Sequence, residues 1–128
     1  MNKQLAKITK ASLEIKERGI LGFWIWVDYE EGGSQGIGGI ALDSWDKKKE
    51  KRVGTAYGCE MIRSLLLCLG VNDFSEMEGK MIWVLGESKG LSFNPKGIER
   101  LNLDKGDSES KSVVFDDIFK EMTEGESK

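Results

Sequence analysis

Residues 19–43 read GILGFWIWVDYEEGGSQGIGGIALD, and this stretch decides the fold class of the chain. Its first half places side chains in two rows, with the period of two that a β-strand imposes. Gly32 and Gly33 follow, and glycine adopts the positive φ angles of a tight turn without steric cost. Apolar residues resume at Ile37. The stretch therefore predicts a strand, a glycine-rich turn and a second strand.

Both rows of the first strand carry large side chains, so the sequence indicates two faces that need cover. The second row contains Trp24, Trp26 and Asp28. The first row is Leu21, Phe23, Ile25, Val27 and Tyr29.

The glycines of the second strand leave part of it without side chains. Such a bare strand admits a close neighbour, which is a tryptophan, a bulge partner or a ligand. The stretch GGSQGIGG is similar in composition to a phosphate-binding loop, but a strand follows it where a helix N-terminus would be needed. A turn with a bulged strand is therefore favoured. The alternative is a small-molecule or nucleotide site formed by Gln35, Gly36, Gly38 and Gly39.

Residues 55–70 have the clearest helical pattern. Thr55 is a suitable N-cap, and Gly70 stands where a C′ glycine ends a helix. Gly58 costs about 1 kcal/mol relative to alanine inside a helix, so we expect close packing against a sheet at that point. Helical spacing predicts a buried stripe of Cys59, Ile62, Leu65, Leu66 and Leu69.

Three more segments, residues 6–19, 80–87 and 90–103, are extended in pattern. Asp73 and Glu76 have the spacing of a capping pair before a short helical turn. Together these elements predict an α+β fold, in which an antiparallel β-sheet packs on one main helix, with an additional C-terminal helix.

The chain changes character towards its C-terminal end. Residues 104–128 contain eight acidic residues and four lysines, a net charge of −4, which leaves +1 on residues 1–103. We expect an α+β core domain over 1–103, an acidic linker over 104–111 and an amphipathic helix over 112–128, capped by Ser112. The apolar stripe of that helix is Phe115, Ile118, Phe119 and Met122.

One central helix covers only one face of a sheet, so the tryptophan row needs another cover. The C-terminal helix is long enough to lie over Trp24, Trp26 and Trp83. Alternatively, the tryptophan face or the tail binds a partner protein, or a homodimer forms through that face. Nucleic acid is disfavoured, because Asp28 and Glu87 would place negative charge beside the stacking surface.

Residues 43–52, DSWDKKKEKR, are interpreted as a charged loop. Glu50 interrupts its lysines, and Asp43 and Asp46 flank them, so the net field is modest. A solvated loop is the favoured interpretation, and contact with an acidic partner is the alternative. The basic residues of the loop are Lys47, Lys48, Lys49, Lys51 and Arg52.

The composition excludes several classes of function. Hydrophobic residues make up 39% of the chain and charged residues 32%, as in a soluble globular domain. The net charge of −3 gives no global field that attracts nucleic acid. The chain has no histidine, which removes the commonest general base and metal ligand. We therefore expect a protein that is not an enzyme and holds no metal or cofactor.

The two cysteines, Cys59 and Cys68, lie nine positions apart and on opposite sides of one helix, so they cannot form a disulfide with each other. We expect buried, reduced thiols in a cytoplasmic protein. No segment approaches the run of about 20 apolar residues that crosses a membrane. The opening MNKQLAKITK lacks the apolar core of a signal peptide.

Two separated blocks carry a family resemblance. The first has a GxGQGFGGYALD-like pattern, carried by Gln35, Gly36, Gly38, Gly39, Leu42 and Asp43. The second has a TAxGxEFIRRhLxxxGVxxWEDLPGK-like pattern, carried by Thr55, Gly58, Glu60, Ile62, Arg63, Gly70, Val71, Gly79 and Lys80. From Gly19 to Val84 the chain thus resembles a family of small proteins encoded by phages and prophages. Trp26 departs from the polar residue of that family, and the acidic tail extends beyond its core.

The resemblance implies a phage or prophage context for the protein. It implies no biochemical mechanism, because no activity is established for the family. Small phage proteins without catalytic groups often bind and block a host protein, including components of CRISPR and other defence systems. We therefore expect an inhibitor in the host cytoplasm, and its contact residues would be Trp24, Trp26, Asp28 and the C-terminal stripe. The alternative is the nucleotide-sequestering protein that uses the glycine-rich turn.

Overall fold

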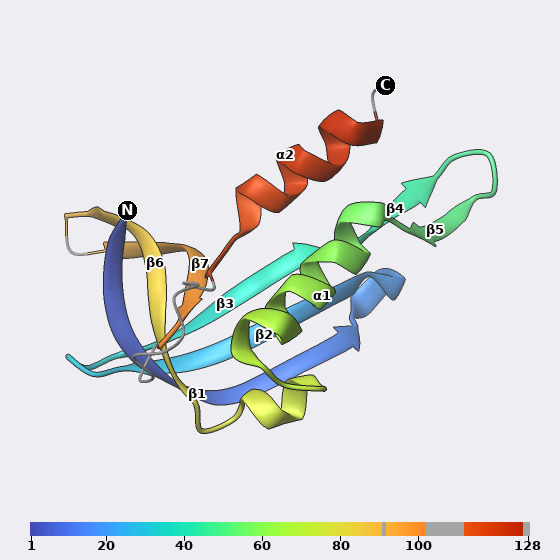
Figure 1. Ribbon diagram of the computed structural model, residues 1–128. Helices are drawn as coiled ribbons and strands as arrows, with labels where there is room; N and C mark the ends of the chain where they lie inside the picture. The colour runs from blue at the N-terminus through green and yellow to red at the C-terminus, as the bar shows by residue number, and fades with distance from the viewer. Residues whose placement is uncertain (91, 102–111, 127–128) are drawn as a thin grey trace.

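The computed structural model describes residues 1–90, 92–101 and 112–126 (Figure 1). It confirms the α+β class, since a curled antiparallel sheet packs on one main helix and a second, C-terminal helix. The elements in chain order are β1 (Asn2–Ile15), η1 (Glu17–Gly19), β2 (Leu21–Tyr29), β3 (Ser34–Ala41), β4 (Asp43–Asp46), β5 (Lys51–Gly54), α1 (Ala56–Leu69), η2 (Phe74–Met77), β6 (Met81–Lys89), β7 (Ser92–Arg100), β8 (Ser112–Val114) and α2 (Phe115–Glu126).

The predicted hairpin consists of β2 and β3, which pair in antiparallel fashion. Its turn contains Gly32 and Gly33, with φ angles of 108° and 91°, so both positions need glycine. The first row of β2 is the interior one, as the alternation indicates, and its centre is fully buried at Phe23, Ile25 and Val27.

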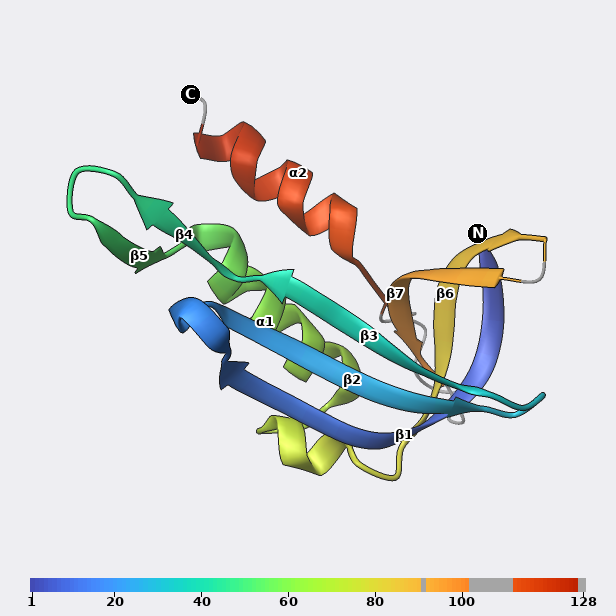
Figure 2. The same cartoon turned by 180° about the vertical axis from the view of Figure 1, so that it is seen from behind.

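β1 is the strand that joins the two halves of the sheet, whose order is β3-β2-β1-β6-β7-β8. Its first half pairs with β6, starting with Asn2 opposite Gly86, and its second half pairs with β2. The register shifts between Ile8 and Lys10, and a bulge of this kind bends a strand. Figures 1 and 2 show the result, a sheet that curls so that β6 and β7 stand steeply against β1 to β3.

α1 confirms the predicted helix together with both caps. Thr55 Oγ1 accepts the N–H of Gly58 at 3.0 Å, and Gly70 ends the helix with a φ of 66°. The Thr55 hydroxyl also donates to the Leu42 carbonyl at 2.7 Å, which ties the start of α1 to the end of β3. A Cβ atom at position 58 would overlap that same carbonyl oxygen. The close packing expected at Gly58 is therefore present.

The buried face of α1 is rotated relative to the predicted stripe. Leu65 and Leu69 are buried as predicted, but Cys59 is exposed, so the expectation of two buried thiols is wrong. The reason is the contact at Gly58. It orients the helix so that the residues one, two and three helical turns after Gly58 face the sheet. The buried residues of α1 are Gly58, Met61, Leu65, Cys68 and Leu69. The half-buried residues of the predicted stripe are Ile62 and Leu66.

The charged stretch 43–52 belongs to a hairpin, β4–β5, and the prediction of a loop is wrong. The carboxylate of Asp46 accepts the backbone N–H groups of Lys48 and Lys49, at 2.9 and 3.2 Å. An aspartate turn of this kind reverses the chain, and no apolar pattern in the sequence indicates the hairpin. The hairpin projects from the body of the molecule (Figures 1 and 2), and its exposed residues include Ser44, Trp45 and Lys51, whereas Asp43 is buried.

The C-terminal segment adds a strand before its helix. Ser112 lies in β8, which pairs with β7, so the prediction of an N-cap at this residue is wrong. α2 begins at Phe115, whose ring contacts Phe23 edge to face at 5.8 Å. The helix thus packs beside α1 on the interior face of the sheet (Figure 1). The acidic linker predicted over 104–111 lies outside the described residues.

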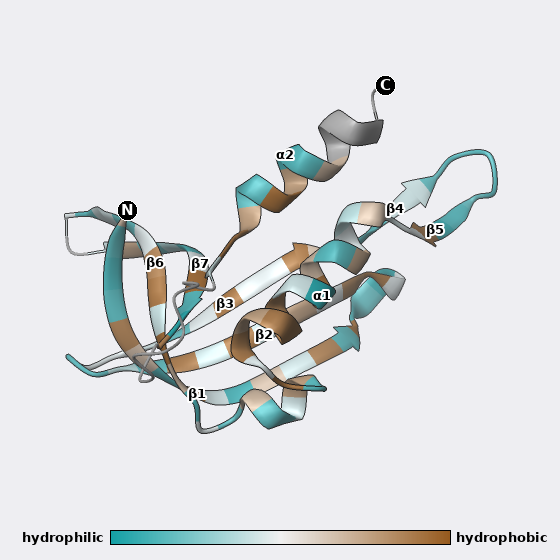
Figure 3. Cartoon of the chain, in the orientation of Figure 1, coloured by the Kyte–Doolittle hydropathy of each residue, from teal (hydrophilic) through white to brown (hydrophobic). Residues whose placement is uncertain are grey.

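Figure 3 shows that hydrophobic residues gather along the strands and along α1. Phe74 and Met77 of η2 close one end of this core. The capping pair predicted before η2 is confirmed, because the Asp73 carboxylate accepts the N–H of Glu76 at 3.2 Å. Within the described part of the chain, no helix has the length and apolar character needed to cross a membrane.

Candidate functional site

Trp24 and Trp26 form a stacked pair on the outer face of β2. Their ring centroids are 5.4 Å apart and the ring planes differ by 19°. Trp26 is 43% exposed, and Trp24 is half-buried. α2 packs on the opposite face of the sheet, against Phe23, so the expectation that the C-terminal helix covers the tryptophans is wrong.

The glycines of β3 make room for these two rings. A Cβ atom at Gly36 would lie 2.7 to 3.0 Å from ring atoms of Trp26, and one at Gly39 would lie 2.7 Å from ring atoms of Trp24. Gly38 has a φ of 117° and lies where the register between β2 and β3 shifts. Two of the three alternatives for the bare strand are therefore present, a tryptophan neighbour and a bulge. The pair lies flat on β3 and is held in place by it.

Positive charge borders the pair. The Lys16 ammonium lies 4.2 Å from the centre of the Trp24 ring, which is a cation–π contact. Asp28, at the other end of the row, accepts a hydrogen bond from the Ser34 hydroxyl at 2.6 Å. The lysines on β1 and directly after it that lie beside this row are Lys7, Lys10 and Lys16.

Trp83 and Glu87 lie on β6 and are not part of the pair. Trp83 is opposite Leu5, and it lines a separate hollow of about 250 Å³. Glu87 is opposite Asn94 on β7. The negative charge expected beside the tryptophan row therefore comes from Asp28, while Glu87 adds none there.

The C-terminal stripe is divided between the core and the surface. Phe115 and Ile118 are each 8% exposed and belong to the core, and Met122 packs against it. Phe119 is 51% exposed, and its ring meets Tyr57 edge to face at 5.3 Å. The structure thus places the stripe and the tryptophan row on different faces of the sheet.

A cleft of about 380 Å³ lies between β3, β7 and the start of α2. It contains three residues of the alternative ligand site, Gln35, Gly36 and Gly38, whereas Gly39 lies beneath the Trp24 ring. The sequence did not indicate the opposite wall, because β3 and β7 are brought together only by the curl of the sheet. Its lining residues are Trp24, Gln35, Gly36, Gly38, Ile40, Asn94, Pro95, Lys96, Phe115 and Asp116.

Gln35 bridges the cleft at one end. Its side-chain amide donates to the Phe93 carbonyl at 3.1 Å, and its oxygen accepts the hydroxyl of Tyr29. The Tyr29 ring also meets the Phe93 ring edge to face, with 6.0 Å between centroids. Burial raises the pKa of Tyr29 to about 12, which keeps the phenol a hydrogen-bond donor at neutral pH. These contacts hold β3 and β7 at a fixed separation.

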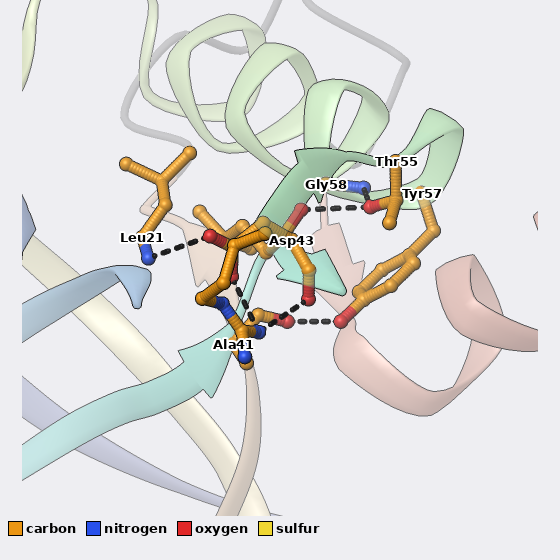
Figure 4. A network of polar contacts seen from close by, with 8 residues as sticks. Leu21, Ala41, Asp43, Thr55, Tyr57 and Gly58 are labelled. Atoms are coloured by element: carbon orange, nitrogen blue, oxygen red, sulfur yellow. Dashed lines mark hydrogen bonds and ion pairs between the residues drawn. The ribbon is translucent and has the colours of Figure 1, made fainter. Parts of the chain in front are cut away.

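A polar network joins β2, the β4–β5 hairpin and α1 (Figure 4). Buried Asp43 accepts the N–H of Leu21 at 3.1 Å and a guanidinium N–H of Arg52 at 2.8 Å. The hydrogen bond from Arg52 lowers the pKa of the Asp43 carboxyl, and the same bond raises the pKa of Arg52. The Tyr57 hydroxyl donates to the Ala41 carbonyl nearby. The network ties these three elements together, although the Nε of Arg52 is buried without a hydrogen-bond partner among the described residues.

The described residues contain no group of three or more histidine, cysteine, aspartate or glutamate residues that could hold a metal ion. Cys59 is an exposed thiol, and the chain contains no histidine beside it.

No protein-family model matches the chain, and comparisons with curated proteins and with solved structures gave no match either.

Proposed function

We propose that this is a non-enzymatic binding protein, and that its contact with a partner protein centres on the Trp24–Trp26 pair. The observation that carries the proposal is the open position of this pair on the outer face of the sheet. Tryptophan is among the residues that dominate the binding energy of protein interfaces. An exposed pair of adjacent aromatic rings is unusual on a surface that serves no contact.

The pair is preorganised for binding. Gly36 and Gly39 let the two rings lie against β3, and Lys16 lies over Trp24. Rings that are already fixed lose little rotamer freedom when a partner covers them. The fixed position of the two rings therefore favours a role as a binding surface.

The charges around the tryptophan pair indicate which kind of partner surface would be complementary to it. Lysines border the pair along β1, so a partner with an apolar centre and acidic groups around it would be complementary. Asp28 gives one edge of the surface the opposite charge.

The biological setting of the proposal rests on the resemblance to phage and prophage proteins. In that setting the partner would be a host protein, and we propose a component of a CRISPR-type defence system that is blocked when it is bound. Inhibition by contact needs no catalytic group.

The experiment compares two exposed tryptophans. Trp26 is 43% exposed on the sheet and Trp45 is 56% exposed on the hairpin, so they are matched in type and accessibility. Tagged wild-type protein, Trp26→Ala and Trp45→Ala are used to capture proteins from host lysate, and bound proteins are quantified by mass spectrometry. A host protein that is lost with Trp26→Ala and retained with Trp45→Ala supports the proposal. Equal capture by all three proteins contradicts it.

The proposal that binding blocks a defence system has a separate test. Wild-type protein is expressed in bacteria that carry an active CRISPR system, and plaques of a targeted phage are counted. We expect more plaques with the wild type and with Trp45→Ala than with Trp26→Ala. Binding without any rise in plaque number would leave a binding protein that is not a defence inhibitor.

A second candidate function is a small-molecule or nucleotide binder, because Gln35, Gly36 and Gly38 line the cleft. Binding of a nucleotide to the native state would raise the melting temperature, and the rise would grow with the logarithm of ligand concentration above the Kd. A melting temperature unchanged by nucleotides, amino acids and other metabolites would count against it.

A further inference from the structure

We propose that the cleft between β3 and β7 binds an extended peptide segment, which pairs through its main chain with both strands. The inference deepens the proposed function, because it describes a segment that the partner protein contributes. Apart from Trp24, which also lines the cleft, it depends on different residues from the Trp24–Trp26 pair, so the two can fail separately.

Both long walls of the cleft are open strand edges. β3 is the terminal strand of its sheet, and among the described residues only β2 pairs with it. β7 pairs with β8 only over residues 97–99, so its residues 92–96 have β6 as their described partner. An open edge presents unpaired backbone donors and acceptors, and an added strand satisfies them. On the β7 wall the Phe93 carbonyl already accepts from Gln35, and Pro95 has no N–H, so most of the pairing would come from β3.

The pairing between β2 and β3 fixes which groups of β3 face the cleft. The N–H of Tyr29 donates to the carbonyl of Gly33, and hydrogen-bonded pairs alternate along an antiparallel ladder. Gln35 and Ile37 therefore bond to β2, whereas the backbone groups of Gly36 and Gly38 point away from it. These are the two glycines that line the cleft.

The order of the strands fixes the direction of the ligand. Every neighbouring pair from β3 through β2, β1 and β6 to β7 is antiparallel, so β3 and β7 run the same way. They cannot close the sheet as an antiparallel pair. One inserted strand that runs opposite to both would continue the alternation and close the sheet into a barrel, which leaves no edge unpaired there.

The width of the cleft fits one strand. Directly paired strands are about 4.8 Å apart. Here a glutamine side chain and a hydrogen bond of 3.1 Å separate the backbones of Gln35 and Phe93. The separation is therefore at most on the order of two strand spacings, and an inserted strand would have to displace the Gln35 side chain at this end of the cleft.

The charges of the cleft favour a peptide over a phosphate ligand. Asp116 lines the cleft at the start of α2 and is followed by Asp117, so this helix N-terminus is already supplied with negative charge. Lys96 is the basic side chain of the lining. A segment antiparallel to β3 would begin at the Asp116 end, and a basic residue or a free amine at its N-terminal end would complement that carboxylate.

The cleft is also continuous with the proposed contact surface. Trp24 belongs to the tryptophan pair and lines the cleft as well. A partner that covers the pair therefore brings its neighbouring residues to the mouth of the cleft.

Hydrogen exchange of the free protein gives the first test. The amides of Gly36 and Gly38 should exchange rapidly, whereas those of Gln35 and Ile37 should be protected, because only the latter bond to β2. Protection of all four amides in the free protein would mean that the edge is already paired, and it would overturn the proposal.

The second test supplies the peptide. A random hexapeptide display library is selected on the folded protein, and the selected peptides are synthesised and added to ¹⁵N-labelled protein. We expect shifts and new protection at Gly36 and Gly38. A spin label on the peptide N-terminus should broaden the amide of Asp116 and not that of Phe93. The proposal would be overturned if no selected peptide shifted the amide signals of these two glycines. It would also be overturned if ATP shifted them and no peptide did.

Two substitutions separate this inference from the proposed function. Lys96→Trp fills the cleft, and we expect it to weaken a selected peptide about tenfold or more, while Lys89→Trp, its control on β6, changes affinity less than about twofold. Trp45→Ala lies outside the cleft lining and should leave peptide affinity unchanged. Equal affinity for Lys96→Trp and the wild type would overturn the peptide cleft even if Trp26→Ala abolished capture of the partner protein.

Discussion

Gly58 is the residue that lets α1 lie directly against the end of β3. Any larger residue would drive its Cβ into the Leu42 carbonyl oxygen, which is backbone and cannot move aside as a flexible side chain would. The same carbonyl accepts the Thr55 hydroxyl, so the contact also sets the start of the helix. One missing side chain thus determines which face of α1 is buried.

We predict that Gly58→Ala destabilises the protein by about 2 kcal/mol or more, although alanine is favoured over glycine by about 1 kcal/mol inside a helix. Gly54→Ala is the control, because a Cβ at that position meets no atom within 4 Å. Urea unfolding followed by circular dichroism measures both variants. A stabilised Gly58→Ala variant would contradict the packing described for α1.

At the scale of residues, the sequence predicted that the glycines are needed but not what each one is for. The positive φ angles of Gly32 and Gly33 follow from a local turn, and local rules were sufficient for them. The roles of Gly36 and Gly39 depend on which residues of β2 lie opposite. Register is a property of two strands, so a single stretch of sequence could only offer alternatives.

At the scale of elements, α2 is divided into a buried beginning and an exposed middle. Phe115 and Ile118 join the core beside Phe23, while Phe119 keeps half of its surface exposed against Tyr57. A helix held by its first turns contributes to stability mainly through those turns.

We predict that Phe115→Ala lowers the free energy of unfolding by about 3 kcal/mol, as for a buried phenylalanine. Phe119→Ala, on the same helix, should cost about 1 kcal/mol, because half of its ring is already in water and one aromatic contact is lost. Chemical denaturation of the two variants compares the same substitution at a buried and an exposed site. Equal losses would show that α2 is not docked as described.

Elements with strong local signals were predicted well, and elements that depend on charged turns were not. The caps of α1 at Thr55 and Gly70 are local, and both are confirmed. The β4–β5 hairpin depends on hydrogen bonds to the Asp46 carboxylate, and its polar strands show no apolar alternation. β8 pairs at only three positions, which is too short for a periodic signal.

At the scale of the whole molecule, buried Asp43 links three parts of the fold. It bonds to Leu21 at the start of β2 and to Arg52 on the hairpin, and it directly follows the carbonyl that α1 packs against. The Arg52 guanidinium and the N–H of Leu21 both stabilise the charged form of Asp43. Loss of that charge therefore weakens several interfaces at once.

We predict that the wild type loses stability at acid pH through Asp43. The pKa of this carboxyl in the folded protein lies below its ordinary value of 3.8, so ionised Asp43 stabilises the fold above that value. The contribution is lost as the pH falls through the folded pKa. Asp43→Asn should cost about 2 kcal/mol at pH 7, and the gap to the wild type should narrow towards pH 3. Urea unfolding across this range measures it, and a gap independent of pH would contradict the assignment.

The cleft shows the limit of prediction at this scale. Gln35, Gly36 and Gly38 were singled out from a glycine pattern, but Lys96 and Asp116 come from segments far along the chain. Only the curl of the sheet, which follows from the bulge in β1, brings them to the same place. The fold class could be predicted from the sequence, whereas the shape of this site could not.

The central position of β1 has a consequence for the order in which the chain folds. β1 precedes the other described strands in the chain, and its first half pairs with β6, with Asn2 opposite Gly86. During synthesis the β1–β2–β3 meander can form before β6 is made, but the β6 side of β1 stays open until β6 has left the exit tunnel. Contacts this distant in sequence slow folding, and an unpaired strand edge is prone to aggregation until it is paired. The β6 side of β1 is therefore completed later than the β2 side.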